Sequence, residues 1–207
     1  MDSLEFRQRR CKILRTATFW LKIAQMVFAV VAIVLCATFN QSAKVHMIDS
    51  HYYYSISLTF PFIYESNITV QASPDLPLRK FTFDTLLLPS TIAFVAVTSL
   101  AFIVAIVVFI FSLTRPGLQE EQDYIKLNFF VSLGLTFVLL ASICLWMTYL
   151  IALVQDVKHE LDFLLDQCQQ NHGKCVKNDP SFITLYISMA FGICLFLLWS
   201  IESIQKF

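Results

Sequence analysis

Candidate chemical groups gather in one polar segment near the carboxyl end of the chain. It contains two histidines, two aspartates and two cysteines: His159, Asp162, Asp166, Cys168, His172 and Cys175. Their spacing matches no zinc or calcium pattern, and the acidic residues suit the solvated face of a helix. The chain also lacks a nucleophile elbow, a phosphate-binding loop, an HExxH helix and paired buried carboxylates. We therefore expect no metal, no cofactor and no enzymatic activity.

The two cysteines of this segment are better explained as a disulfide. Gly173 allows the chain between Cys168 and Cys175 to turn, and a secretory compartment would oxidise the pair. Three further cysteines lie in apolar runs, where thiols are usually buried and inert: Cys36, Cys144 and Cys194. Cys11 either bears a palmitoyl chain or stays a free thiol.

Four long apolar runs must position these groups. They occupy residues 19–39, 89–113, 127–154 and 182–204. A hydrocarbon core about 30 Å thick needs about 20 helical residues to cross it, and each run supplies at least that many with few charges. The composition agrees, because 57% of the residues are apolar and only 14% are charged. We predict an all-α membrane protein built as a four-transmembrane-helix bundle.

Gln25 is the only strongly polar side chain well inside the first run. A lone glutamine in lipid usually hydrogen-bonds to a neighbouring helix, so we predict a helix–helix polar contact there rather than a site for a transported ligand. Trp20 and Lys22 suit the membrane interface, where the lysine ammonium can reach back to the headgroups. Lys22 and Glu202 both lie near ends of apolar runs, which disfavours a pump or ion-coupled carrier.

Basic residues directly precede the first run and predict its orientation. They form a lipid-facing basic cluster: Arg7, Arg9, Arg10, Lys12 and Arg15. Such clusters stay cytoplasmic during insertion, and four crossings return the carboxyl terminus to the same side. The predicted order is cytoplasmic 1–18, span 19–39, luminal 40–88, span 89–113, cytoplasmic 114–126, span 127–154, luminal 155–181, span 182–204 and cytoplasmic 205–207. We expect no cleaved signal peptide.

The first luminal loop should contain a small sheet. Apolar or aromatic residues alternate with other residues over 52–60, Pro61 ends that strand, and 68–70 begins a second one. Asn67 starts an Asn-Ile-Thr sequon and is a predicted glycosylation site, although single sequons also arise by chance. A second sequon, at Asn40, lies too near the membrane for modification.

The third span should continue beyond the membrane as an amphipathic helix. Val157, Leu161 and Leu164 recur at helical spacing, while charged residues take the other faces. Such an extension lies either on the membrane surface or against the first loop, and both arrangements stay open.

Several segments resemble the synaptophysin family. The first span contains Lys22-Ile23-Ala24-Gln25-Met26-Val27-Phe28-Ala29, followed by Ala32 and Cys36. Further matches follow in the family's order: Phe60-Pro61-Phe62, Trp146 with Asp156-Val157-Lys158, Cys168 with Cys175, and Phe191-Gly192 with Trp199. The chain departs from the family in lacking a cysteine pair in the first loop, a Tyr/Gly-rich tail and polar asparagines in the fourth span.

This resemblance implies a MARVEL-type bundle in the membrane of secretory or synaptic-like vesicles. It implies association with membrane lipid, including cholesterol, and assembly into homo-oligomers. The implied partners are a vesicle SNARE of the synaptobrevin type or subunits of the V-ATPase proton pump. Nothing in the chain suggests nucleic-acid binding. Two other functions stay open: a channel or carrier, or its accessory subunit, and a junctional adhesive tetraspan.

Overall fold

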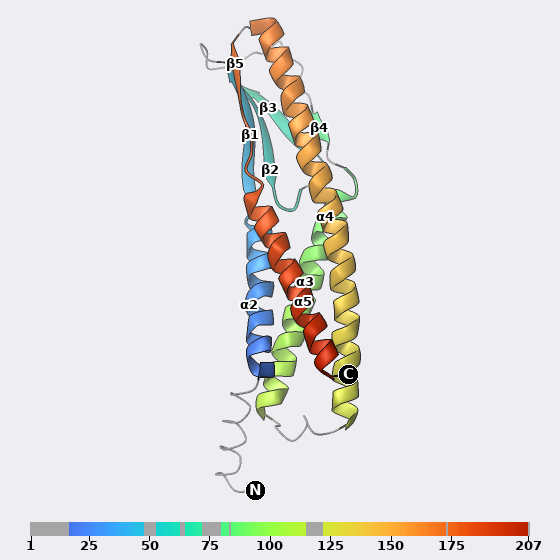
Figure 1. Cartoon of the computed structure of the whole chain (residues 1–207). Helices are drawn as coiled ribbons and strands as arrows, with labels where there is room; N and C mark the ends of the chain where they lie inside the picture. The colour runs from blue at the N-terminus through green and yellow to red at the C-terminus, as the bar shows by residue number, and fades with distance from the viewer. Residues whose placement is uncertain are drawn as a thin grey trace. The chain divides into compact units, whose positions relative to one another are not determined.

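The computed structural model describes residues 17–47, 53–62, 65–71, 80–82, 84–114, 122–172 and 174–206. Four helices occur in these residues: α2 (Ala17–Ala37), α3 (Leu87–Thr114), α4 (Gln122–His172) and α5 (Ile183–Lys206) (Figure 1). By length and composition, all four are able to cross a membrane, which confirms the four predicted apolar helices.

The ends of the helices differ from the predicted runs for local reasons. α3 begins at Leu87, two residues before Pro89, after a turn at Asp84. The Asp84 carboxylate accepts a hydrogen bond from the amide of Leu86 at 2.9 Å, and the Asp84 carbonyl accepts one from the amide of Leu87 at 3.1 Å. Pro89 still lies in the first turn, where a missing amide donor is tolerated. α2 ends at Ala37, so Phe39 falls outside the helix.

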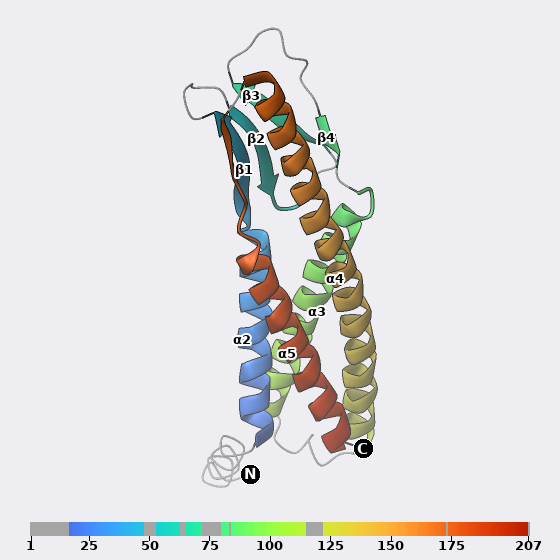
Figure 2. The same ribbon diagram turned by 45° about the horizontal axis from the view of Figure 1, so that its top comes forward.

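The strands form a five-stranded sheet in the order β4-β3-β2-β1-β5, and every pairing is antiparallel. They are β1 (Asn40–Met47), β2 (Tyr53–Thr59), β3 (Glu65–Gln71), β4 (Lys80–Thr82) and β5 (Cys175–Asn178). Figure 2 shows β1 and β2 side by side. The two predicted strands correspond to β2 and β3, whereas β1, β4 and β5 were not predicted.

The described residues form two compact units. Unit 1 comprises 17–34, 94–114, 122–143 and 187–206, and thus takes one segment from each helix. Unit 2 comprises the described residues of 35–93 and 144–186, and contains the sheet. Each unit has its own core.

Small residues allow the helix segments of unit 1 to pack closely. Its core joins alanines to larger side chains: Ala29, Ala101, Ala105, Leu135, Leu139, Leu195 and Trp199. Gly192 of α5 packs against the ring of Phe94, since an added Cβ would lie 2.9 Å from that ring. Ser188 donates a hydrogen bond to the backbone carbonyl of Ala32 at 2.7 Å. Close backbone approach and hydrogen bonds of this kind are the usual means of joining helices in lipid.

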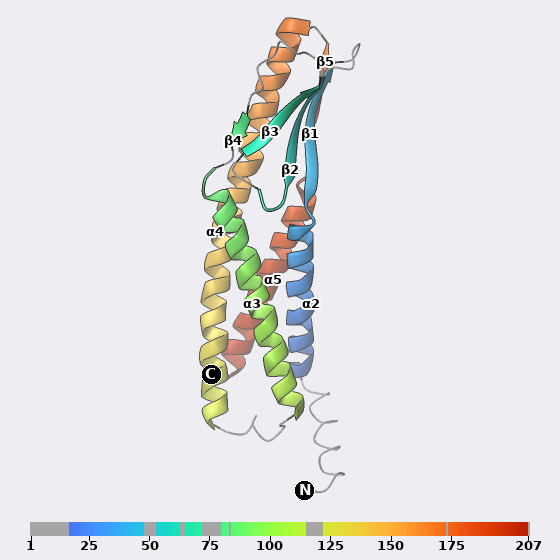
Figure 3. The ribbon, with the colours of Figure 1, turned by 180° about the vertical axis from the view of Figure 1, so that it is seen from behind.

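The extension of α4 in unit 2 covers one face of the sheet (Figures 1 and 3). Its buried residues recur at helical spacing: Leu150, Leu153, Val157, Leu161, Leu164 and Cys168. The sheet buries alternate residues of β1 and β2, among them Val45 and Ile56. Of the two arrangements that the sequence allowed, the extension adopts the one against the first loop.

An aromatic cluster fills the rest of the core of unit 2. The ring of Phe62 lies 5.7 Å from that of Phe39 and 6.1 Å from that of Trp146, between centroids, and Phe39 also stacks on Phe182. Phe62 has a φ of 58°, which is unusual for a residue other than glycine. The Phe62 side chain is buried, and its contacts with Phe39 and Trp146 offset the free-energy cost of that backbone conformation.

Candidate functional site

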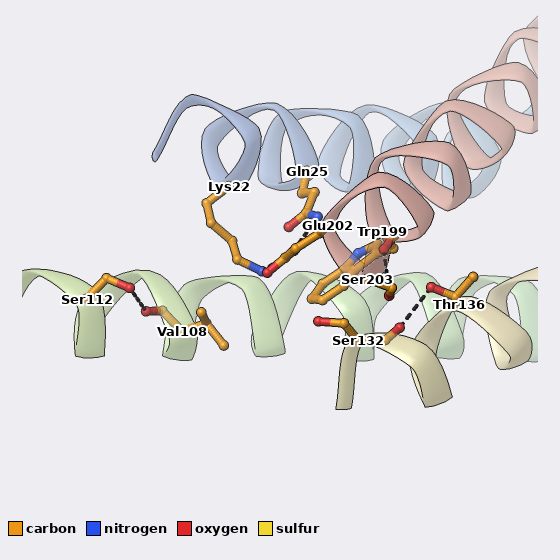
Figure 4. A network of polar contacts seen from close by, with 9 residues as sticks. All are labelled: Lys22, Gln25, Val108, Ser112, Ser132, Thr136, Trp199, Glu202 and Ser203. Atoms are coloured by element: carbon orange, nitrogen blue, oxygen red, sulfur yellow. Dashed lines mark hydrogen bonds and ion pairs between the residues drawn. The ribbon is translucent and has the colours of Figure 1, made fainter. Parts of the chain in front are cut away.

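Two helices of unit 1 bring a buried cation and a buried anion together. On α2, Lys22 and Gln25 are three residues apart and share one face, and on α5 the same spacing places Trp199 beside Glu202. Lys22 Nζ lies 2.6 Å from Glu202 Oε2 (Figure 4). The exposed fractions of the two side chains are 3% and 1%. We call these four residues the polar cluster.

Gln25 and Trp199 complete the surroundings of the ion pair. Gln25 Nε2 donates a hydrogen bond to Glu202 Oε2 at 2.8 Å, so one carboxylate oxygen accepts from two donors. Lys22 Nζ also lies 4.1 Å from the centroid of the Trp199 ring. A cation over the face of an indole is attracted by its quadrupole, most strongly where water is excluded. The carboxylate and the indole together stabilise the ammonium inside the bundle.

The prediction that Lys22 reaches back to the headgroups is wrong. Its ammonium points inward, where it meets the Glu202 carboxylate and the face of the Trp199 ring. The partners are separated by 180 residues, so no local pattern joins them. One signal was available in the sequence: a single lysine and a single glutamate interrupt the first and fourth apolar runs, near ends that the four-span topology places on one side of the membrane.

Some buried polar atoms of unit 1 have no hydrogen-bond partner among the described residues. In the polar cluster these are Gln25 Oε1 and Trp199 Nε1, and both side chains are 0% exposed. On α4, Asn128 Oδ1 and Ser132 Oγ are in the same situation, and Ser132 appears in the close view of the cluster (Figure 4). The polar cluster therefore contains both an unused acceptor and an unused donor.

A second set of interactions lies in unit 2 at the carboxyl end of α4. Cys168 of α4 and Cys175 of β5 form the expected disulfide, with their Cα atoms 6.2 Å apart. Lys177 Nζ lies 2.6 Å from an oxygen of Asp162 and 3.8 Å from an oxygen of Asp179. The hydrogen bond to Asp162 raises the pKa of Lys177 above its usual value, with a further contribution from the charge of Asp179.

Among the remaining candidate residues, those that the structure describes are not brought together. His159 and Asp166 are exposed on α4, and within the described ranges no three His, Cys, Asp or Glu residues group in a way that could hold a metal ion. Asn67 lies in β3, where its backbone pairs with that of Lys80 in β4. The basic cluster lies outside the described residues: Arg7, Arg9, Arg10, Lys12 and Arg15.

Comparison of the chain with protein-family models and with curated proteins found no match.

Proposed function

We propose that this chain is a non-enzymatic four-span protein of secretory or synaptic-like vesicles, which organises the membrane and binds other vesicle membrane proteins. The proposed partners are a synaptobrevin-type vesicle SNARE, V-ATPase subunits, cholesterol-containing lipid and further copies of the chain. Both termini lie in the cytoplasm in this proposal, and the bundle is of the MARVEL type.

The outward face of α4 in unit 1 is the observation that supports this proposal best. Phe130 and Phe137 are 67% and 64% exposed, and Gly134 lies between them on the same side of the helix. A Cβ added at Gly134 would meet no atom within 4 Å. Helices associate in lipid by close packing at small residues, since lipid tails are as apolar as leucine. A glycine between two exposed aromatic rings suits a neighbouring membrane helix.

Crosslinking in native vesicles tests this proposal. A photoreactive phenylalanine analogue at Phe137 should capture one or a few defined membrane proteins, which mass spectrometry identifies as a SNARE, a pump subunit or a second copy. Gly134→Leu should reduce that yield about tenfold, because added bulk keeps a partner helix away. Val107→Leu, on an exposed position of α3, is the matched control and should leave the yield unchanged. Capture of a random sample of membrane proteins contradicts the proposal.

The orientation of the chain in the membrane requires a separate test. Glycosidase should shift the wild-type chain on a gel and leave Asn67→Gln unchanged, because a glycan requires the lumen. Antibody tags at the two termini should become accessible together in selectively permeabilised cells. Tags that respond differently contradict an even number of crossings.

A channel or carrier is the second candidate function. It is favoured by one observation, the ion pair of Lys22 and Glu202 inside the bundle, because ionisable groups within spans often mark ion pathways. Flux through the purified protein in reconstituted vesicles, abolished by Glu202→Gln, would support it. An absence of flux above that of empty vesicles removes it.

A further inference from the structure

The sheet of unit 2 has a second face, on the side away from α4. The α4 side is marked by buried Val45 of β1, because its partner in β5 is Lys177, whose ammonium reaches Asp162 of α4. Successive residues of a strand alternate between the two faces, so the exposed residues of β1 and β2 lie on the other one. We call these six residues the outer face: Asn40, Ser42, Lys44, His46, Ser57 and Thr59.

The side chains of the outer face are polar and mostly short. Four of the six end in a hydroxyl or an amide, and none is a carboxylate. Among the sheet residues whose side chains the structure describes, Val176 of β5 is the only large apolar one that is exposed. Protein interfaces are usually centred on large apolar and aromatic side chains. Sugar hydroxyls both donate and accept hydrogen bonds, as this set of side chains does, so the outer face suits carbohydrate better than protein.

One position of β3 provides an attachment point for carbohydrate on this face. Buried Ile56 of β2 pairs with Ile68 of β3, so the preceding position of β3, Asn67, belongs to the outer face and follows the register beside Ser57. Asn67 begins the Asn-Ile-Thr sequon. Because β3 lies between β2 and β4, a glycan attached there starts within the sheet and not at its edge.

The sheet geometry places the rest of the outer face within reach of that glycan. Ser57 pairs with Ser42, which is two residues from Lys44 in β1. With strands about 4.8 Å apart and a rise of about 3.4 Å per residue, the Cα atoms of Asn67 and Lys44 are about 12 Å apart. A glycan is bulky, and a branched chain of several sugars spans that distance.

We propose that a glycan on Asn67 covers the outer face of the sheet and hydrogen-bonds to its hydroxyl and amide side chains. This inference rests on the luminal position of the sheet in the proposed function, because a glycan requires the lumen. The covered face is closed to protein partners. The exposed side of α4 in unit 2 stays open to them.

Lysine acetylation of the purified full chain in mild detergent tests this proposal. Lys44 reports on the outer face, and Lys158, which is exposed on α4, is the matched control. Two substitutions at the last residue of the sequon form a matched pair, because Thr69→Ser retains the sequon and Thr69→Ala destroys it. Mass spectrometry measures the acetylation rate of each lysine, and gel mobility shows which chains carry the glycan.

Lys44 should be acetylated at least about threefold faster in Thr69→Ala than in Thr69→Ser, because the bulky sugar no longer restricts access. Lys158 should react equally in both variants, which also shows that the alanine variant folds. Removing the glycan from the folded wild-type chain with a glycosidase should reproduce the increase without any substitution.

Equal Lys44 rates with and without a glycan that the gel detects overturn the proposed cover and leave the luminal orientation and the proposed function intact. A wild-type chain without a glycan overturns the cover as well. The same acetylation in opened native vesicles detects a different occupant. Lys44 protection that persists there in Thr69→Ala assigns the outer face to a protein partner and contradicts the proposal.

Discussion

Two lysine–carboxylate pairs in this molecule have the same N–O distance and opposite surroundings. Lys22 and Glu202 in unit 1 are 2.6 Å apart with side chains 3% and 1% exposed, whereas Lys177 and Asp162 in unit 2 are 2.6 Å apart at 31% and 61% exposed. Water screens the second pair and also hydrates each partner when the pair opens. Solvent does not screen the first pair and does not hydrate its partners when the pair opens. Breaking the buried pair should therefore cost more free energy than breaking the exposed pair, although the two N–O distances are equal.

The largest expected effect comes from removing one partner of the buried pair. Lys22→Met removes the ammonium that lies 2.6 Å from the buried Glu202 carboxylate, which should lower the free energy of unfolding by about 3–5 kcal/mol. Lys177→Met is the matched control. Titration from mild detergent into SDS, with unfolding followed by Trp fluorescence, measures both variants. Equal losses of unfolding free energy for the two lysine variants would show that burial does not make the first pair more important for stability than the second.

Removing both buried charges sharpens the same comparison. The double variant Lys22→Met/Glu202→Leu removes both charges of the pair, so it should recover most of the stability that Lys22→Met loses. A double variant less stable than either single variant would mean that the pair is favourable in itself, rather than costly only when half of it is removed. The same SDS titration distinguishes these results.

The disulfide of unit 2 is expected to have the next largest effect. Replacing Cys168 and Cys175 by serine opens a short covalent loop, and loop-closure entropy predicts a loss of about 2–3 kcal/mol. Hydrogen exchange should show increased opening of β5 and the carboxyl end of α4, while Gln25 and its neighbours in unit 1 keep their protection. Loss of protection in unit 1 would show that the two units do not open independently.

The exposed pair should contribute little by itself. Lys177→Met should lower the free energy of unfolding by about 0.2–1 kcal/mol, and high salt should abolish the difference from wild type. Repeating the substitution in the serine variant shows whether the disulfide holds Lys177 near Asp162. A loss comparable to that of Lys22→Met would contradict the role assigned to solvent.

The smallest expected effect is a dependence on alkaline pH. Because Asp162 raises the pKa of Lys177 above the ordinary 10.5, the pair contributes fully below that pH, and its contribution is lost as pH rises through the higher folded-state pKa. The difference in stability between wild type and Lys177→Met should therefore shrink above pH 10.5. A difference that grows with pH would reverse the sign.

Local patterns in the chain predicted a large part of the fold. Four apolar runs gave four helices, the alternation around Tyr54 and Ile56 gave β2, and the spacing of Val157 and Leu161 gave the extension of α4. Each of these patterns is a property of neighbouring residues, and a helix or strand repeats over a few residues. β5 escaped prediction because the four residues Cys175–Asn178 become a strand only when β1 pairs with them.

The polar cluster was likewise predicted only in part. Gln25 was predicted as a contact between helices because a lone amide in an apolar run needs a partner within lipid. Its partner, Glu202, and the inward turn of Lys22 followed from no local pattern.

The order of residues alone determined that this chain has four helices able to span a membrane and a cysteine pair close enough to bond, because hydropathy and short loops act locally. Only the tertiary structure decided which buried charges meet. The pairing of Lys22 with Glu202 depends on the packing of α2 beside α5, which brings together residues from opposite ends of the chain. A charged side chain inside an apolar bundle is stable only where such packing supplies an opposite charge.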